Sequence, residues 1–137
     1  MRAEVFLDTP YTIALASAND LFHTRALHLA EEIKRAGVRL VTTRAVVLEI
    51  GNALSRQRYR SAAVKLLTAL EADPTIEIIP LSEELYDRAW RLYRERPDKE
   101  WGLTDCVSFS VMQERGLTEA LTTDEHFQQA GFQALMR

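Results

Sequence analysis

Short apolar runs alternate along this chain with longer segments of helical periodicity. The first run, Ala3–Leu7, is followed by helix-like sequence, and the same order repeats after residues 38–42, 75–79 and 119–122. Strands that alternate with helices pair in parallel, because each helix carries the chain back across a face of the sheet. We therefore expect a three-layer α/β/α fold with a central, mostly parallel sheet of four to five strands.

Local signals indicate where the helices lie. Pro10 suits the first turn of a helix that follows Asp8 or Thr9, and Gly37 and Gly116 suit helix ends. Ser82 is a good N-cap for another helix. Further helices are expected over residues 23–36, 44–56, 61–72, 104–115 and 124–129, with a joint at 57–60 and a last strand at 132–135.

Composition is that of a soluble globular protein. The chain has 137 residues, of which 47% are hydrophobic and 27% charged, so we expect a single domain over residues 1–137. Its apolar stretches are too short to cross a membrane, and the first residues lead into a strand, which argues against a signal peptide. The lone Cys106 excludes an internal disulfide and favours a reducing cytoplasm.

Four acidic residues, Asp8, Glu49, Asp105 and Asp124, each stand inside or directly after an apolar segment. Two of them follow strands directly, and ligand sites of open parallel sheets lie at that edge. The other two lie in helices that can face the same edge. Carboxylates near an apolar interior are costly unless their charge is compensated, and a divalent metal is the simplest compensation. We therefore expect a hard-cation site, with phosphodiester hydrolysis as its use.

Each of these acids also has a plainer interpretation. Asp8 and Asp124 could be helix N-caps, and Glu49 could be a solvated helix residue. Asp105 suits the first turn of a helix, where the helix dipole favours an anion. The helix after Asp105 is apolar almost all round, which indicates burial. Placement of all four at one sheet edge favours a shared site.

Four segments, Phe6-Leu7-Asp8-Thr9, Glu49-Ile50-Gly51-Asn52-Ala53-Leu54, Leu103-Thr104-Asp105-Cys106 and Thr122-Thr123-Asp124-Glu125-His126-Phe127, share a known pattern. Through them the chain resembles the PIN-domain nucleases, especially the VapC-like toxin ribonucleases, over nearly its full length. The resemblance implies a PIN-like fold and a quartet of Asp8, Glu49, Asp105 and Asp124 that binds Mg²⁺ or Mn²⁺. Thr9 and Thr123 match the small hydroxyl positions nearby.

The resemblance also implies a function. We expect a metal-dependent endoribonuclease, the toxin of a toxin–antitoxin pair, which hydrolyses RNA with a metal-activated water and leaves 5′-phosphate ends. Its antitoxin protein would lie in a groove beside the site, for which the apolar residues of segments 46–54 and 62–70 are candidates. A homodimer is a further expected assembly. The alternative is a PIN-like module that binds nucleic acid or protein without catalysis. A haloacid-dehalogenase-like phosphatase is disfavoured, because Pro10 stands where a second acid is needed.

Several other residues are candidates for supporting roles. The net charge of −3 argues mildly against a nucleic-acid partner, but Arg56, Arg58 and Arg60 cluster locally and are RNA-binding candidates. Asn52 stands one turn from Glu49 and is expected to orient that carboxylate.

The remaining polar and aromatic candidates are interpreted as structural. The basic residues between positions 88 and 99 are diluted by acids, which predicts a solvated, salt-bridged helix face. Trp101 is expected to pack rather than stack on a base, and Cys106 to be an inert buried thiol. The three histidines are scattered, so a zinc site is not expected, and His126 is interpreted as a surface or packing residue.

Overall fold

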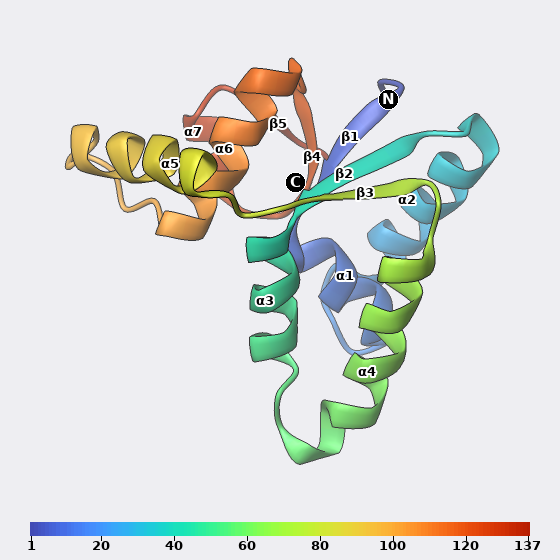
Figure 1. The fold of residues 1–137 in the computed structure, drawn as a ribbon. Helices are drawn as coiled ribbons and strands as arrows, with labels where there is room; N and C mark the ends of the chain where they lie inside the picture. Colours follow the sequence, from blue (N-terminus) through green and yellow to red (C-terminus); the bar gives the residue numbers. More distant parts are fainter.

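Five parallel strands form one sheet in the order β3-β2-β1-β4-β5 (Figure 1). The computed structural model describes all 137 residues. Its strands are β1 Glu4–Leu7, β2 Arg39–Thr43, β3 Ile76–Ile79, β4 Glu119–Leu121 and β5 Gln133–Ala134. Every neighbouring pair is parallel, and β1 lies in the centre, paired with β2 on one side and β4 on the other. The predicted parallel sheet is confirmed.

Helices cover both faces of this sheet, which gives the predicted three layers (Figure 1). They are α1 Thr9–Ala16, α2 His23–Ala36, α3 Arg44–Ala53, α4 Gln57–Ala72, α5 Glu83–Glu95, α6 Leu103–Arg115 and α7 Glu125–Gln129. In Figure 1, α1, α2 and α4 lie to one side of the sheet, and α5, α6 and α7 to the other. None of the helices has the length and apolar character needed to cross a membrane.

The main core forms where α6 packs against the sheet. Phe6 of β1, Phe109 of α6 and Phe127 of α7 are fully buried, and the rings of Phe109 and Phe127 meet edge to face with centroids 5.0 Å apart. Aromatic pairs in this geometry add to the stabilisation from burial, which is about 1.5–3 kcal/mol for a Phe side chain. Residues 106–112 of α6 are all buried, as the sequence predicts. This packing fixes the first turn of α6, which carries Asp105.

Helix ends mostly follow the predicted signals. Gly37 and Gly116 end α2 and α6 with φ of 65° and 66°, a left-handed conformation that glycine adopts without strain. The predicted joint between α3 and α4 is wrong. Helix α3 ends at Ala53 and α4 begins at Gln57, so residues 57–60 are helical and the connection is residues 54–56. Gln and Arg are good helix formers, and no glycine or proline interrupts them.

Candidate metal centre

All four predicted acids line one pocket of about 250 Å³ at the carboxyl edge of the sheet. The pocket is lined by Asp8, Thr9, Pro10, Ile13, Asp20, Phe22, Glu49, Asp105, Thr123 and Asp124. A fifth acid that the sequence did not single out, Asp20, joins them from the loop between α1 and α2. Its carboxylate also accepts a hydrogen bond of 2.8 Å from the backbone N–H of Phe22, which holds that loop. No lysine or arginine lines the pocket.

Asp8 follows the central strand and is the most buried of these acids, with 4% of its surface exposed. Its carboxylate accepts a hydrogen bond of 2.7 Å from the Thr122 hydroxyl. Burial raises the pKa of Asp8 to about 7, although the hydrogen bond from Thr122 opposes this rise and the nearby Glu49 and Asp105 add to it. Asp8 occupies the N-cap position of α1 but accepts no capping hydrogen bond. Its carboxylate is therefore directed to the site instead.

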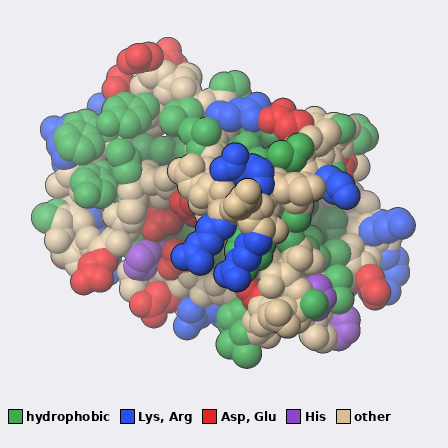
Figure 2. Space-filling view, turned by 90° about the horizontal axis from the view of Figure 1, so that it is seen from below, with side chains coloured by type: hydrophobic (Ala, Val, Ile, Leu, Met, Phe, Trp, Pro, Cys, Tyr) green, Lys and Arg blue, Asp and Glu red, His purple; other side chains and the backbone are tan.

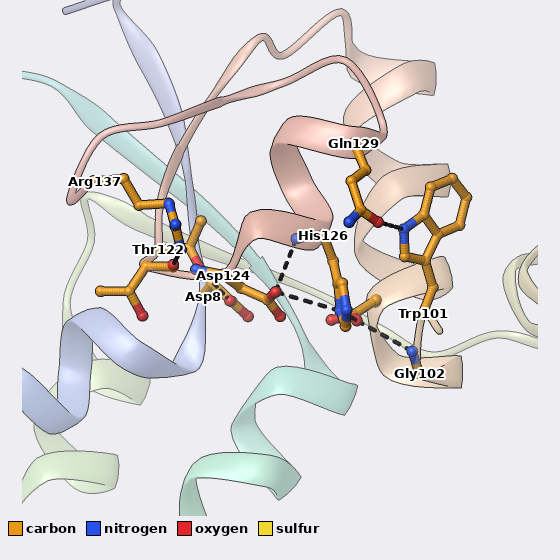
Figure 3. A network of polar contacts seen from close by, with 10 residues as sticks. Asp8, Trp101, Gly102, Thr122, Asp124, His126, Gln129 and Arg137 are labelled. Atoms are coloured by element: carbon orange, nitrogen blue, oxygen red, sulfur yellow. Dashed lines mark hydrogen bonds and ion pairs between the residues drawn. The ribbon is translucent and has the colours of Figure 1, made fainter. Parts of the chain in front are cut away.

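Asp105 is held in the first turn of α6 by two contacts of one oxygen atom. Its Oδ2 accepts a hydrogen bond of 3.1 Å from the backbone N–H of Gly102 and lies 3.0 Å from Nδ1 of His126 (Figure 3). Burial raises the pKa of Asp105, and the contact with His126 lowers it in part. The predicted first-turn position is confirmed, and the carboxylate also faces the pocket.

Asp124 is both a helix cap and a wall of the pocket. Its Oδ1 accepts a hydrogen bond of 2.9 Å from the backbone N–H of His126, and the ring nitrogen of that histidine lies 3.3 Å away (Figure 3). The capping interpretation is thus confirmed for Asp124. One ligand atom each from Asp105, Asp124 and His126 lies within 4.8 Å of the others. The ring of His126 is satisfied by these contacts, but the sequence interpretation did not show that its partners are two of the acids.

Glu49 approaches the pocket from α3 and is exposed to solvent. Asn52 is exposed one turn further along, and no hydrogen bond joins its amide to Glu49. The expected contact between them is therefore absent. Of the four acids, only Glu49 is exposed and has no side-chain hydrogen bond.

Three threonines surround Asp8, and they differ in their contacts. The Thr9 hydroxyl is buried without a hydrogen-bond partner, and Thr123 lines the pocket. Thr122, which the sequence interpretation missed, donates to Asp8 and accepts a hydrogen bond of 3.0 Å from the backbone N–H of Asp124. It thus links two acids of the site.

The three RNA-binding candidates lie around the tip where α3 meets α4. Arg56 is the N-cap residue of α4, and Arg58 and Arg60 follow in its first turn. The guanidinium of Arg58 lies 4.7 Å from the ring centroid of Tyr59, and Arg60 donates a hydrogen bond of 2.7 Å to the Ser55 carbonyl. Figure 2 looks at this end of the molecule and shows Lys and Arg side chains gathered beside Asp, Glu and His side chains.

Two other residues beside the site are structural, as predicted. Trp101 is 6% exposed, packs edge to face on Phe109, and donates a hydrogen bond of 3.0 Å from Nε1 to Gln129 (Figure 3). Cys106 is fully buried, and burial raises the pKa of its thiol to about 11. A thiol with so high a pKa is a poor nucleophile at neutral pH.

The chemistry of the pocket fits a hard divalent cation. Its charged groups are all carboxylates, which Mg²⁺ and Mn²⁺ prefer as ligands, and the imidazole of His126 adjoins them. Asp8 is a buried acid with no cationic side chain as a partner, so its charged form is costly. A cation among these acids would remove that cost and their mutual repulsion.

Comparisons with known proteins agree with this geometry. The family model for the PIN domain matches residues 5–133. The 23S rRNA-specific endonuclease VapC20 of Mycobacterium tuberculosis is 27% identical over 128 residues, which cover 93% of this chain and 95% of the relative.

Solved structures give the same picture. The crystal structure of Mycobacterium tuberculosis VapC20, a sarcin–ricin loop cleaving toxin, matches with a TM-score of 0.81 and 26% identity over 93% of this chain and 95% of that one. VapBC2 from Rickettsia felis, bound to a DNA fragment from their promoter, has a TM-score of 0.66 and covers 96% of each chain, but at 15% identity it is similar in fold alone. By its matched length, its parallel sheet and its relatives, the chain belongs to the PIN-domain family.

Proposed function

We propose that this chain is an Mg²⁺- or Mn²⁺-dependent endoribonuclease and the toxin of a toxin–antitoxin pair. One observation carries the proposal. The four acids Asp8, Glu49, Asp105 and Asp124 line a single pocket that no lysine or arginine enters. The similarity to a 23S rRNA-specific endonuclease supports RNA as the substrate class.

In this proposal the four acids hold the metal and Thr122 and His126 position them. The hydroxyl of Thr122 orients Asp8, and the imidazole of His126 orients Asp105. Thr9 and Thr123 supply further hydroxyls at the wall of the pocket. A bound divalent cation would lower the pKa of a water molecule and offset charge on the scissile phosphate. Asp8 would give up its proton on metal binding, since its pKa without metal is about 7.

RNA binding needs a source of positive charge, because the acidic pocket repels phosphates. The basic tip formed by Arg56, Arg58 and Arg60 supplies that charge at the start of α4. Lys and Arg side chains lie beside acidic side chains at this end of the molecule (Figure 2). Guanidinium groups bind phosphates by paired hydrogen bonds, and Tyr59 adds an aromatic ring beside them. We assign phosphate contacts to these three arginines.

The antitoxin is proposed to bind a large apolar hollow walled by α1, α2 and α4. The hollow has a volume of about 510 Å³, and Leu7, which precedes Asp8, forms part of its wall. We expected the groove between α3 and α4, but the hollow is walled by α4 residues such as Leu66 and Leu70 together with α1 and α2. Its apolar lining suits the apolar face of a partner helix.

Cleavage of RNA by the purified chain tests the proposal. A single-stranded RNA is incubated with Mn²⁺ or Mg²⁺, and the ends of the products are identified by enzymatic labelling. We expect internal cleavage with 5′-phosphate and 3′-hydroxyl ends, and none in EDTA. Ends that carry a 2′,3′-cyclic phosphate would overturn the metal-dependent hydrolysis. RNA that is bound but stays intact would favour a non-catalytic binding module instead.

A further inference from the structure

A second pocket, of about 420 Å³, lies where the end of α5 leads into α6. It combines aromatic rings with basic side chains, and Trp90, Tyr93, Arg94, Arg96, Pro97, Lys99, Glu100, Trp101 and Cys106 line it. We call it the aromatic–basic pocket. None of the metal-binding acids enters it, and its residues have no role in the proposed metal chemistry.

Two aromatic side chains of the pocket are exposed to solvent and are not part of the hydrophobic core. Trp90 and Tyr93 are 41% and 44% exposed, and their rings stack with centroids 5.8 Å apart at an interplanar angle of 18°. Helix α5 already anchors itself to the core through Leu85 and Ala89, which are buried. The stacked pair therefore presents a flat apolar surface to solvent.

The charges around these rings favour an anionic ligand. Three basic side chains, Arg94, Arg96 and Lys99, line the pocket with one acid, Glu100. Arg96 is already paired with Asp98, so Arg94 and Lys99 remain to bind an anion. The guanidinium of Arg94 lies 5.8 Å from the ring centroid of Trp90, and no acidic side chain forms an ion pair with Arg94. The predicted salt-bridged face is thus confirmed only in part, at Arg96 with Asp98 and at Arg88 with Glu114.

The aromatic–basic pocket and the metal centre both involve the first turn of α6. Cys106 lines the aromatic–basic pocket, and its chain neighbour Asp105 lines the metal centre. An α-helix with its side chains is about 10–12 Å across, so both pockets lie within reach of one short stretch of nucleic-acid strand. Trp101 also lines the aromatic–basic pocket, and its hydrogen bond to Gln129 ties it to α7.

From these features we infer that the aromatic–basic pocket is a subsite for an unpaired nucleobase of the RNA substrate. The base stacks against the Trp90–Tyr93 pair, and Arg94 and Lys99 contact the flanking phosphates. Single-stranded nucleic acids are bound in this way, by aromatic faces beside basic side chains. The inference rests on the proposed function only for its substrate, since the stacking itself needs no metal.

A second copy of this chain is a poorer occupant than RNA. Lys and Glu are depleted at protein–protein interfaces, and this pocket contains both Lys99 and Glu100. A copy of the chain would also have to desolvate Arg94, for which this surface offers one acid, Glu100. RNA phosphates satisfy the same basic groups directly.

Fluorescence of a modified RNA tests the subsite. The probe is an eight-nucleotide oligouridylate with a single 2-aminopurine, placed at each position in turn, and EDTA prevents cleavage. Binding should quench the fluorescence at one position, because 2-aminopurine is quenched when it stacks. Trp90→Ala and Tyr93→Ala should each weaken binding about 10-fold and relieve the quenching. The matched control is Tyr86→Ala, which removes a ring that is 42% exposed on the same helix but outside the pocket.

The salt dependence of RNA affinity and the oligomeric state of the variants supply the remaining tests. Arg94→Gln should weaken binding uniformly and lower the slope of log affinity against log salt by about 0.7. Equal affinity of wild type, Trp90→Ala and Tyr93→Ala would overturn the inference, as would a loss shared with Tyr86→Ala. A change from dimer to monomer in Trp90→Ala, with RNA affinity intact, would assign the surface to a second copy instead. If the protein does not cleave RNA but still quenches 2-aminopurine at one position, the proposed nuclease activity is wrong and the nucleobase subsite is supported.

Discussion

The two halves of the metal centre are built on different physical principles. One half is Asp8 with Thr122, which is buried, and where burial raises the pKa of the acid to about 7. The other half is Asp105, Asp124 and His126, whose side chains are partly exposed and joined to backbone N–H groups and to one another. In the first half, the ionised carboxylate of Asp8 destabilises the fold. In the second half, hydrogen bonds to the carboxylates of Asp105 and Asp124 stabilise their ionised forms.

This difference predicts which acid destabilises the protein when no metal is bound. A buried carboxylate without a cationic partner destabilises the fold whenever it is ionised. Carboxylates that accept backbone hydrogen bonds at helix starts contribute stability of their own. Loss of charge should therefore abolish function in both halves. It should stabilise the metal-free protein chiefly at Asp8 and to a smaller extent at Asp105, since burial raises the pKa of that acid as well.

The largest effect is expected on cleavage, where the two halves should behave alike. Asp8→Asn and Asp124→Asn each remove a charged ligand, so the rate at saturating Mn²⁺ should fall by more than about 100-fold, a loss that even groups supporting a metal ligand can cause. Circular dichroism should show intact folds. Asn at position 124 caps a helix almost as well as Asp, and Asn at position 8 keeps an oxygen that can accept the hydrogen bond from Thr122. Glu114→Gln, on α6 but outside the pocket, is the control. Wild-type rates in both Asn variants would contradict the site assignment.

The pH dependence of stability should separate the halves. The unfolded chain releases the Asp8 proton near its ordinary pKa of 3.8, whereas the native protein keeps it to about pH 7. Between these values the native state binds more protons, so the contribution of Asp8 is full below pH 4 and is lost as the pH rises through 7. We expect a loss on the order of a few kcal/mol in the free energy of unfolding between pH 5 and pH 8 without metal.

Urea titrations in EDTA at several pH values would measure this loss, and the raised pKa of Asp105 should add to it. Asp8→Asn should flatten the profile, whereas Asp124→Asn should keep most of it. A profile in Asp8→Asn as steep as that of wild type would mean that the pH dependence comes from other groups.

Metal addition should reverse the same penalty. At 100 times its dissociation constant, a ligand that binds only the native state adds about 2.7 kcal/mol, so millimolar Mn²⁺ at pH 7.5 should raise the Tm by several degrees. The shift should vanish in Asp105→Asn. Calorimetry with and without Mn²⁺ measures it, and an unchanged Tm in the wild type would argue against a metal centre.

The smallest effect is expected at the hydroxyl that joins the halves. Thr122→Val removes the hydrogen bond to Asp8 and the acceptor for the Asp124 N–H, which should cost about 1–3 kcal/mol of stability. It should also raise the pKa of Asp8 further, which carboxyl-carbon NMR can follow. Thr123→Val, whose hydroxyl makes no hydrogen bond, should change both quantities less. Equal effects of the two substitutions would remove the special role of Thr122.

Local patterns were enough to predict the sheet, the helix ends at Gly37 and Gly116, and the convergence of the four acids. Strand direction explains this success, because every parallel strand delivers its following residue to the same edge. The helix start at Gln57 was missed, since three residues without glycine or proline make the turn. A short connection without glycine or proline gives little indication in the sequence of where one helix ends and the next begins.

Contacts between residues that are far apart in the sequence could not be predicted from such local patterns. Thr122 bonds to a residue 114 positions away, and His126 meets Asp105 across 21 positions. Asp20 reaches the pocket from a loop whose path depends on how α1 and α2 pack. Each of these residues is polar and ordinary in its local sequence. Only the tertiary structure distinguishes them from solvated side chains.

The central place of β1 sets when a newly made chain can become active. This strand is translated before its partner β4, and Asp8 is translated 114 positions before Thr122, the residue that donates to it. Until β4 and Thr122 dock, Asp8 lacks its hydroxyl partner and the pocket lacks a wall. Pairing across so long a stretch of chain is slow to form. A chain that ends before Thr122 is therefore expected to lack a complete metal centre.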